Sequence, residues 1–445
     1  MAASTSIRLE SDQALAASAE VARNLLSSGL NPGDRMCISA MNSPKLLITV
    51  LGALRVGIIP ALVSKQSTAR ELGEMSSDIG AIRVLHDEDI AKLFRAGVDS
   101  TDIQWDLSEY PRCRPIHFTS GTTGRPKAVW SGWLDELQSR AWISEEIETW
   151  GISDQDVHLV NGPMSHSAPL RFALMTIYAG GSVVIPPRFD AAEASSLIGG
   201  GDVTTTFVAP THLQRMKELN PNMPEIDSMR LVAHAGAACP DHVRIWAHRA
   251  FGVDRVFEFF GSTEGQFTCC SAVEWMQHPG TVGRARSGRE LTIDSDGQIW
   301  CRVPDFATFT YWGDEGRSSA TWKQGNWFTI GDFGRIDDEG FVYLAGRKGD
   351  LIITGGVNVY PAEIERVLTE LPGVEDAIAF GVPDDTWGQR VCVAVQGSVT
   401  EADIRTYLKE QLAGPKQPKS IYIIDSFPRT HSGKIDRLRV LEMLN

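Results

Sequence analysis

The sequence predicts an α/β protein: a large N-terminal α/β region with a β-rich subdomain, followed by a small mobile α+β C-terminal domain. Three observations support this prediction. The 445 residues exceed what one hydrophobic core usually organises, so two or three domains are expected. Strand and helix patterns alternate before residue 280. Short β-like segments follow, and a compact alternation of strands and helices begins at residue 350.

Hydrophobic periodicity and capping residues predict the elements of the N-terminal region. Apolar residues recur at helical spacing from Ser11 until Gly29 ends the run. Ser43 is expected to cap a second helix with Pro44 at its first position. Because further helices separate the predicted strands, we expect a mainly parallel sheet. These strands are 36–40, 58–63, 116–118, 157–160, 182–185, 204–208, 229–233 and 256–259.

The domain boundaries follow from changes in this pattern. Between residues 280 and 332, turns rich in Gly, Asp and Ser separate predicted strands 290–293 and 298–303, which indicates a β-rich subdomain. A strand at 341–345 then leads into Gly-Arg-Lys-Gly-Asp, a typical boundary composition. We therefore predict an N-terminal domain at 1–346, a hinge at 347–349 and a mobile C-terminal domain at 350–445.

Composition narrows the class of partner and compartment. The net charge is −14 and no run of Lys and Arg exceeds two residues, which argues against a nucleic-acid or anionic-membrane partner. Neither a leader pattern nor a long apolar span is present, so a cytoplasmic monomer or homodimer is expected. Seven scattered cysteines without Cys-x-x-Cys favour a reducing compartment.

A loop rich in glycine and hydroxyl groups follows the predicted strand 116–118. Glycine lets backbone N–H groups approach an anion, hydroxyls add donors, and a lysine adds a positive charge. This composition predicts a phosphate site, but two residues rather than four separate the glycines, so it is not a Walker loop. The residues of this phosphate loop are Thr119, Ser120, Gly121, Thr122, Thr123, Gly124 and Lys127.

Three further segments follow the phosphate loop in a definite order. They are Phe-Gly-Ser-Thr-Glu at 260–264, Trp-Phe-Thr-Ile-Gly-Asp at 327–332 followed by Gly346-Arg347, and Pro-Arg-Thr-His-Ser-Gly-Lys at 428–434. Together these four motifs resemble the class I adenylate-forming enzymes, which include acyl-CoA synthetases, adenylation domains and luciferases. The resemblance spans about 32–437. It implies activation of a carboxylate with ATP to an acyl-adenylate and pyrophosphate, followed in many members by transfer to a thiol.

The resemblance assigns nucleotide contacts to specific positions. The phosphate loop would contact the β- and γ-phosphates, Thr263 the α-phosphate, and Glu264 a Mg²⁺ ion that bridges carboxylate and phosphate. An ordinary loop and a plain surface glutamate are the structural alternatives. Phe260 would stack on adenine, although an aromatic residue after a buried strand is equally often part of a core. Gly261 would contact the cofactor and border the acyl pocket.

The ribose and acyl positions are assigned in the same way. Asp332 would accept both ribose hydroxyls and Arg347 would supply a second contact to ribose or phosphate. The usual threonine two positions before the aspartate is Ile330 here. The small residues Gly236 and Ala237 resemble the turn against which adenine and the acyl group lie, with a simple tight turn as the alternative.

Lys434 resembles the lysine that reaches the α-phosphate and carboxylate oxygens, where an ammonium stabilises developing negative charge. A solvated terminal lysine is the alternative. His166 resembles the histidine that gates the acyl pocket, although a lone buried histidine is more often structural. Arg171, on an apolar segment, can pair with a second substrate carboxylate, but pairing with a surface acid is the favoured interpretation.

The second half-reaction depends on the C-terminal domain. Gly355 and Gly356 resemble glycines that line the pantetheine channel of CoA synthetases, and ending a strand is an equally good explanation for them. Gly349 stands where the family hinge usually has Asp or Lys. The sequence therefore predicts an acyl-CoA synthetase that uses ATP, Mg²⁺, coenzyme A and a hydrophobic carboxylic acid. The alternatives are an adenylation enzyme that loads a carrier protein or an amine, and a non-catalytic nucleotide-binding protein.

Overall fold

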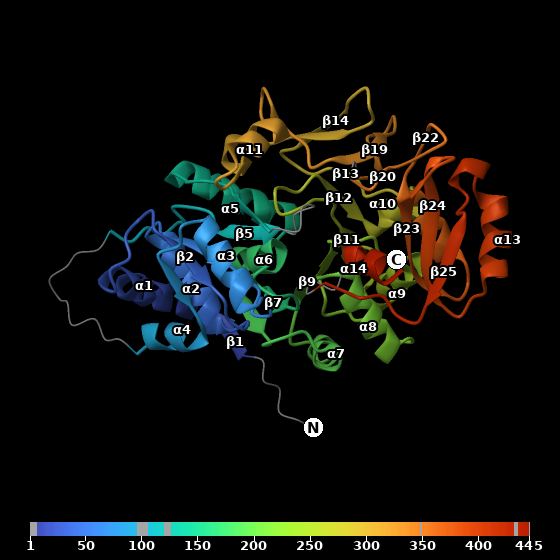
Figure 1. Cartoon of the computed structure of the whole chain (residues 1–445). Coiled ribbons are helices and arrows are strands. Elements are labelled where there is room, and N and C mark those ends of the chain that lie inside the picture. Colours follow the sequence, from blue (N-terminus) through green and yellow to red (C-terminus); the bar gives the residue numbers. More distant parts are fainter. Residues whose placement is uncertain (1–6, 96–105, 120–125, 348, 431–434, 445) are drawn as a thin grey trace.

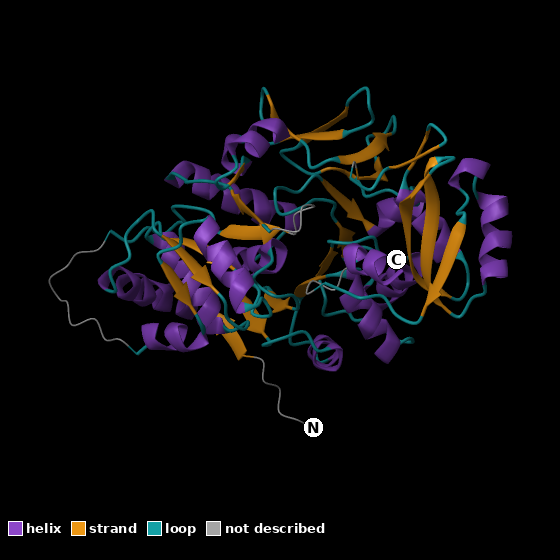
Figure 2. Cartoon of the chain, viewed as in Figure 1, coloured by secondary structure: helices purple, strands orange, loops and turns teal. Residues whose placement is uncertain are grey.

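The computed structural model describes residues 7–95, 106–119, 126–347, 349–430 and 435–444. Figure 1 shows an N-terminal part built from two sheets and their helices, a β-rich part above them, and a C-terminal part at the right of the view. Helices lie beside the sheets of the N-terminal and C-terminal parts, whereas the β-rich part consists mainly of strands and loops (Figure 2). The predicted α/β class and the two-part organisation of sheet-rich and small C-terminal regions are confirmed.

The first sheet has eight strands and a parallel centre. Strands β8, β7, β9, β10 and β11 run parallel, whereas β1, β12 and β13 add antiparallel strands at the two edges. The parallel prediction therefore holds only where helical crossovers connect the strands. In sheet order the strands are β1 (Ile7–Glu10), β8 (Ser182–Ile185), β7 (Val157–Val160), β9 (Thr205–Val208), β10 (Leu231–His234), β11 (Val256–Glu258), β12 (Thr268–Ser271) and β13 (Arg284–Ala285).

The second sheet has six strands and carries the phosphate loop. Strands β5, β3, β2 and β4 are parallel, and β6 and β16 are antiparallel additions. The chain passes from β2 to β3 on one side and then to β4 on the other. In sheet order the strands are β16 (Thr310–Tyr311), β6 (Lys127–Trp130), β5 (Ile116–Thr119), β3 (Ile59–Leu62), β2 (Arg35–Ile38) and β4 (Arg83–Leu85).

Helices join the two sheets through a shared core. The predicted cap is present, because Ser43 accepts a hydrogen bond from the Leu46 backbone N–H and Pro44 is the first helical residue. Buried faces of α1, α2 and α6 contribute to one cluster together with strands of both sheets. The helices are α1 (Ser11–Ser27), α2 (Pro44–Arg55), α3 (Ala69–Asp78), α4 (Asp87–Leu93), α5 (Glu136–Trp150), α6 (Ser167–Tyr178), α7 (Ala191–Gly199), α8 (Pro210–Leu219), α9 (Asp241–Phe251) and α10 (Ala272–Gln277).

The predicted β-rich region forms a four-stranded sheet and a separate hairpin around an aromatic core. Phe267, Phe309 and Phe328 lie within this core. A short helix, α11 (Glu315–Thr321), interrupts the strands and was not predicted from the sequence. The sheet contains β14 (Glu290–Ile293), β15 (Ile299–Arg302), β18 (Trp327–Phe328) and β17 (Trp322–Lys323), and the hairpin pairs β19 (Asp332–Ile336) with β20 (Val342–Arg347).

The C-terminal part has one five-stranded sheet with its own hydrophobic clusters. The middle of β24, Val391 to Val395, is buried because helices cover the two faces of the sheet. The strands are β22 (Val357–Val359), β21 (Ile352–Thr354), β24 (Gly388–Gly397), β23 (Val374–Asp384) and β25 (Ser420–Ile424). The helices are α12 (Pro361–Glu370), α13 (Glu401–Gln411) and α14 (Arg437–Leu444). The exact boundary and the hinge remain predictions.

Candidate active site

The topology brings several predicted site segments to one edge of the first sheet. Strands β7, β10 and β11 are parallel, and each is followed directly by one of these segments. His166 follows β7, Gly236 and Ala237 follow β10, and residues 260–264 follow β11. Ligands in open α/β sheets bind at the carboxyl ends of strands, where such loops meet. The segments that follow β7, β10 and β11 are far apart in the sequence but therefore lie at the same edge of the sheet.

The phosphate loop connects two antiparallel strands of the second sheet. Thr119 at the end of β5 lies opposite Lys127 at the start of β6, so the two ends of the loop are held together. Ser120, Gly121, Thr122, Thr123 and Gly124 lie outside the described residues.

Side-chain contacts attach this hairpin to the first sheet. His117 of β5 contacts the backbone oxygen of Ser165 at 3.2 Å through Nδ1. The Asn42 amide donates to the Gly162 backbone oxygen and accepts from the Met164 backbone N–H, both at 2.9 Å. The segment that carries His166 is therefore fixed to both sheets.

Glu264 is held by a tyrosine from a different part of the chain. The Tyr311 phenol donates to Glu264 Oε1 at 2.9 Å, and the Glu264 backbone N–H donates to the Ser262 hydroxyl at 3.2 Å. Tyr311 lies in β16, which pairs with β6. This contact therefore links Glu264 to the strand that begins at Lys127, the last residue of the phosphate loop. Burial, together with Glu264, raises the pKa of Tyr311 well above its ordinary value, so the phenol stays a donor at neutral pH.

The segment before Glu264 is tightly packed. Gly261 forms a bridge with Gln266, and a Cβ at Gly261 would lie 2.5 Å from the Gly265 backbone oxygen. No larger residue fits there without moving the backbone. Phe260 is half-buried, and its ring centroid is 5.2 Å from that of the core residue Phe267. Part of the Phe260 ring thus packs against the aromatic core, and the rest is accessible to a ligand.

Asp332 is a buried carboxylate with one occupied oxygen. Arg347 donates from Nε to Asp332 Oδ1 at 2.8 Å across the β19–β20 hairpin, where the two residues are register partners. Within the described residues, Asp332 Oδ2 is buried without a hydrogen-bond partner. Burial raises the pKa of Asp332, against the lowering effect of Arg347, and Asp350 and Glu264 raise it further. The free oxygen can accept hydroxyl donors from a ligand.

The local backbone conformation explains why residues 355 and 356 are both glycine. Thr354 pairs with Val357, and Gly355 and Gly356 form the two-residue turn between β21 and β22 with φ values of +55° and +78°. Such a hairpin turn requires positive φ at both positions, which favours glycine. The strand-ending interpretation therefore explains them, and their predicted contact with CoA stays a prediction. Lys434 lies outside the described residues.

Arg171 lies on α6 and contacts an acid, but this acid is not on the surface. Its Nε lies 3.3 Å from Oε2 of Glu146, a residue of α5 that is only 5% exposed. The favoured expectation of a surface acid was therefore wrong. Arg114, Arg286 and Arg289 gather at the same place and were missed, because they share no sequence motif. Only the tertiary structure brings the segment before β5 and the segment between β13 and β14 to α5 and α6.

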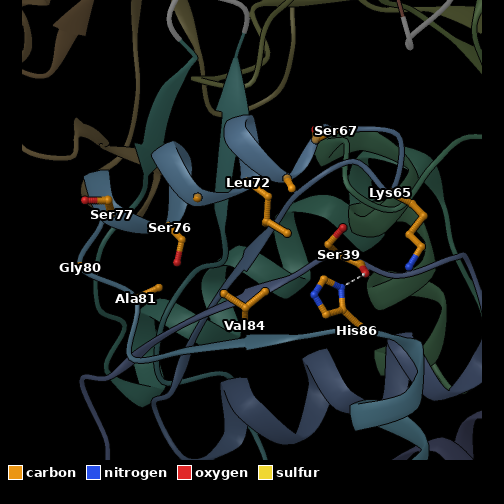
Figure 3. A pocket seen from close by; sticks show the side chains of 12 residues that line it. Ser39, Lys65, Ser67, Leu72, Ser76, Ser77, Gly80, Ala81, Val84 and His86 are labelled. Atoms are coloured by element: carbon orange, nitrogen blue, oxygen red, sulfur yellow. Dashed lines mark hydrogen bonds between the residues drawn. The ribbon is translucent and has the colours of Figure 1, made fainter.

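A cavity of about 740 Å³ lies elsewhere, beside α3 and the carboxyl ends of β2 and β4 (Figure 3). His86 contacts the Ser39 backbone oxygen at 3.3 Å, and both residues line the cavity together with Lys65 (Figure 3). None of the residues predicted from the motifs lines this cavity. Lys65 is paired with Asp87 at 3.0 Å, so its positive charge is compensated.

The donor set near Glu264 fits a cation bound chiefly by substrate. Within the described part of the chain, no three His, Cys, Asp or Glu side chains gather as a metal site. Mg²⁺ commonly uses one or two carboxylates together with phosphate oxygens and water, so a single positioned glutamate is sufficient.

None of the helices in the described ranges has the length and apolar character needed to cross a bilayer.

The fold and the convergence of these segments define a two-part α/β nucleotide-binding protein. The chain belongs to the AMP-binding enzyme family, whose profile matches residues 7–305, while the profile of the AMP-binding enzyme C-terminal domain matches residues 363–434. The family resemblance expected from the four motifs is confirmed.

Named relatives and solved structures agree with this membership. The 2-succinylbenzoate–CoA ligase of Geobacillus sp. (strain WCH70) is 30% identical, over 95% of this chain and 90% of that protein. The long-chain-fatty-acid–CoA ligase FadD13 of Mycobacterium tuberculosis is 29% identical, over 97% and 92%. The o-succinylbenzoate CoA synthetase MenE of Bacillus subtilis, solved with its acyl-adenylate intermediate, matches with a TM-score of 0.85 and 25% identity, over 96% and 92%.

Proposed function

We propose that this protein is an ATP-dependent acid–CoA ligase that forms an acyl-adenylate and then an acyl-CoA. The observation that carries the proposal is the buried Asp332 carboxylate, which has one oxygen on Arg347 and the other without a partner among the described residues. A buried acceptor without a donor is costly, and a ribose hydroxyl would satisfy it. The relatives named above are CoA ligases and support the same activity.

Residues of this chain would divide the work of the first step. Thr119, Lys127 and the loop between them would hold the leaving pyrophosphate, Asp332 the ribose, and Thr263 the α-phosphate. Glu264 would hold Mg²⁺, which neutralises phosphate charge when bound. Tyr311 would keep the Glu264 carboxylate in position through its hydrogen bond. The substrate carboxylate would attack the α-phosphorus opposite the leaving pyrophosphate.

Lys434 would stabilise negative charge on the reacting oxygens, because a positioned ammonium acts most strongly in the transition state. His166 would lie beside the acyl group, since its segment is fixed next to β5 through His117 and Ser165. The substrate carboxylate itself is the nucleophile in this step. The reaction therefore requires no nucleophilic side chain of the protein.

The second step would need movement of the C-terminal part about residues 347–349. A Cβ at Gly349 would meet no heavy atom within 4 Å, so the backbone there is not locked by packing. Rotation would bring Gly355 and Gly356 to the adenylate and admit the CoA thiol. The thiol would then displace AMP from the acyl group.

The deciding experiment measures pyrophosphate release from ATP and Mg²⁺ with aryl, short, medium and long acids, each with and without CoA. Sustained release only with CoA, with acyl-CoA as product, is the expected result. Release that does not depend on CoA would favour a carrier-protein thiol or an amine as acceptor. Complete absence of acid-dependent release would contradict the ligase function and favour a non-catalytic nucleotide-binding protein.

A further inference from the structure

A cluster of buried and half-buried charges lies next to the proposed reaction centre and has no role in the proposed ligase function. It joins α5 and α6 to the segment between β13 and β14 and to Arg114, two residues before β5. We call it the arginine cluster. Its members are Arg114, Arg171, Arg286, Arg289, Glu145 and Glu146.

The charges in this cluster do not balance. Four guanidinium groups face two carboxylates, which leaves an excess of two positive charges. Both carboxylates are already engaged: Glu146 contacts Arg286 at 3.1 Å and Arg171 at 3.3 Å, and Glu145 forms a two-point pair with Arg289. Buried charge without a partner is strongly unfavourable, so a network built only for stability should be neutral.

The excess charge is located on Arg114 and Arg171. No carboxylate of the described residues lies within ion-pair distance of Arg114, which stacks over Trp142 at 3.8 Å and donates to the Phe306 backbone oxygen at 3.4 Å. Arg171 forms one ion pair, with Glu146, and its Nη2 is buried without a hydrogen-bond partner among the described residues. Its other contacts are with the uncharged rings of Phe172 and Phe259. Burial lowers the pKa of Arg114 to about 10, so the group is still charged at neutral pH.

Both arginines line one small cavity that extends to two residues of the proposed site. The cavity has a volume of about 40 Å³ and is also lined by Ser167, the residue after His166, and by Thr263, the predicted α-phosphate contact. One water molecule needs about 10–15 Å³ of such a cavity, so the cavity admits a group of a few atoms and not a long chain. Trp142, Leu170 and Leu174 supply its apolar walls.

We propose that Arg114 and Arg171 bind a second carboxylate on the acid substrate, which makes the substrate a short dicarboxylic acid. The inference rests on the proposed ligase function. One carboxylate reacts beside Thr263, and the other accepts charge-assisted hydrogen bonds from the two guanidinium groups. The connection between the two carboxylates is short, because one small cavity adjoins both positions. The second carboxylate of the substrate would thus neutralise part of the positive charge that Glu145 and Glu146 leave uncompensated.

The test compares each dicarboxylic acid with the monocarboxylic acid of equal carbon number, from three to six carbons, and phthalate with benzoate. Acid-dependent pyrophosphate release gives kcat/KM for both members of a pair. The expected preference for one diacid is about 100-fold, and Arg171→Gln should reduce it to less than about 10-fold. The surface residue Arg284, which pairs with Glu274, provides the control: Arg284→Gln should leave the preference unchanged.

A second variant separates substrate binding from structural support. Glu146→Gln removes a negative charge and increases the positive excess, so a folded Glu146→Gln protein should keep or increase the diacid preference. Equal use of diacids and monoacids by the wild type, or loss of preference in Glu146→Gln to the level of Arg171→Gln, would overturn the inference.

Thermal unfolding distinguishes failure of this inference from failure of the ligase function. If no acid supports pyrophosphate release, the ligase function fails. A rise in Tm with a diacid alone, absent with its monoacid partner and lost in Arg171→Gln, would still support the anion site. No diacid-specific rise in Tm and no diacid preference in turnover would together reject the site, even if monoacids are activated.

Discussion

The Tyr311 phenol lies 2.9 Å from Glu264 Oε1 and donates a hydrogen bond to it. Through this one contact, a two-residue strand of the second sheet orients the Glu264 carboxylate, which lies in the segment after β11 of the first sheet. The strand that carries Tyr311 is itself paired with β6, so the position of Glu264 depends on the same element that ends the phosphate loop.

Removal of this hydrogen bond should weaken adenylation. We expect Tyr311→Phe to lower kcat/KM for ATP about 10-fold and to raise the Mg²⁺ concentration for half-maximal rate, since a hydrogen bond to a charged group contributes ~1.5–3 kcal/mol. Pyrophosphate release at varied Mg²⁺ measures both. Tyr407→Phe, on α13 of the C-terminal part, is the control. An unchanged Mg²⁺ dependence in Tyr311→Phe would contradict the assigned role of Glu264.

Loss of the Asp332 charge should weaken nucleotide binding rather than the fold. Asp332→Asn is expected to raise KM for ATP by about 10-fold to 100-fold, because the amide replaces a charged acceptor of ribose hydroxyls. The exposed neighbour Asp338 allows a matched change of charge, and Asp338→Asn should leave KM unaltered. Equal KM values for the two variants would show that Asp332 only anchors Arg347.

Lys434 should be required for the first half-reaction. We expect Lys434→Ala to lower the rate of adenylate formation about 100-fold or more, the scale seen when one donor to a developing charge is removed. Single-turnover formation of the acyl-adenylate measures this step directly. Lys409→Ala, an exposed position on α13, controls for loss of positive charge in the same domain. An undiminished rate in Lys434→Ala would remove Lys434 from the mechanism.

The turn at Gly355 and Gly356 offers a test of the CoA path. A Cβ at Gly356 would meet no heavy atom within 4 Å, so Gly356→Ala costs only the strain of φ +78°, about 1 kcal/mol. We expect it to raise KM for CoA and to leave pyrophosphate release in the first turnover unchanged. Gly325 has the same φ in the β17–β18 turn, and Gly325→Ala matches the strain. Identical KM for CoA in both variants would favour a purely structural turn.

Buried histidines should make the protein sensitive to mild acid. His158 is 1% exposed, and burial lowers its pKa to about 3. The unfolded chain binds a proton near pH 6.5 whereas the folded chain does not, so this histidine supports stability above pH 6.5 and progressively less as pH falls toward 3.

The change in unfolding free energy with pH measures this contribution. We expect His158→Gln to make the slope between pH 4 and 6 shallower by ~1.4 kcal/mol per pH unit, the value for one proton. Urea unfolding at fixed pH steps gives the slope, and the value at pH 7.5 gives the separate cost of the lost contact with Thr205. Parallel curves for the two proteins would mean that His158 is protonated equally in both states.

The sequence alone determined most of the local structure. Helical spacing of apolar residues, the Ser43 cap and the glycines that end helices act within one or two turns of chain, so α1 and α2 could be predicted closely. The family and its ordered motifs were also readable, because each motif is a short continuous segment. Contacts between elements that are distant in the sequence leave no such local pattern. The short helix α11 and the antiparallel strands at the sheet edges were therefore missed.

Only the tertiary structure decided which distant side chains meet. The sequence located Glu264, Asp332 and Arg171, but it gave no signal that Tyr311 orients the first, that Arg347 occupies one oxygen of the second, or that Glu146 meets the third. These pairs are separated by 47, 15 and 25 residues, and packing of whole elements brings them together. Hydrogen bonds and buried charges act over a few ångströms, so their partners are fixed by the folded arrangement and not by spacing along the chain.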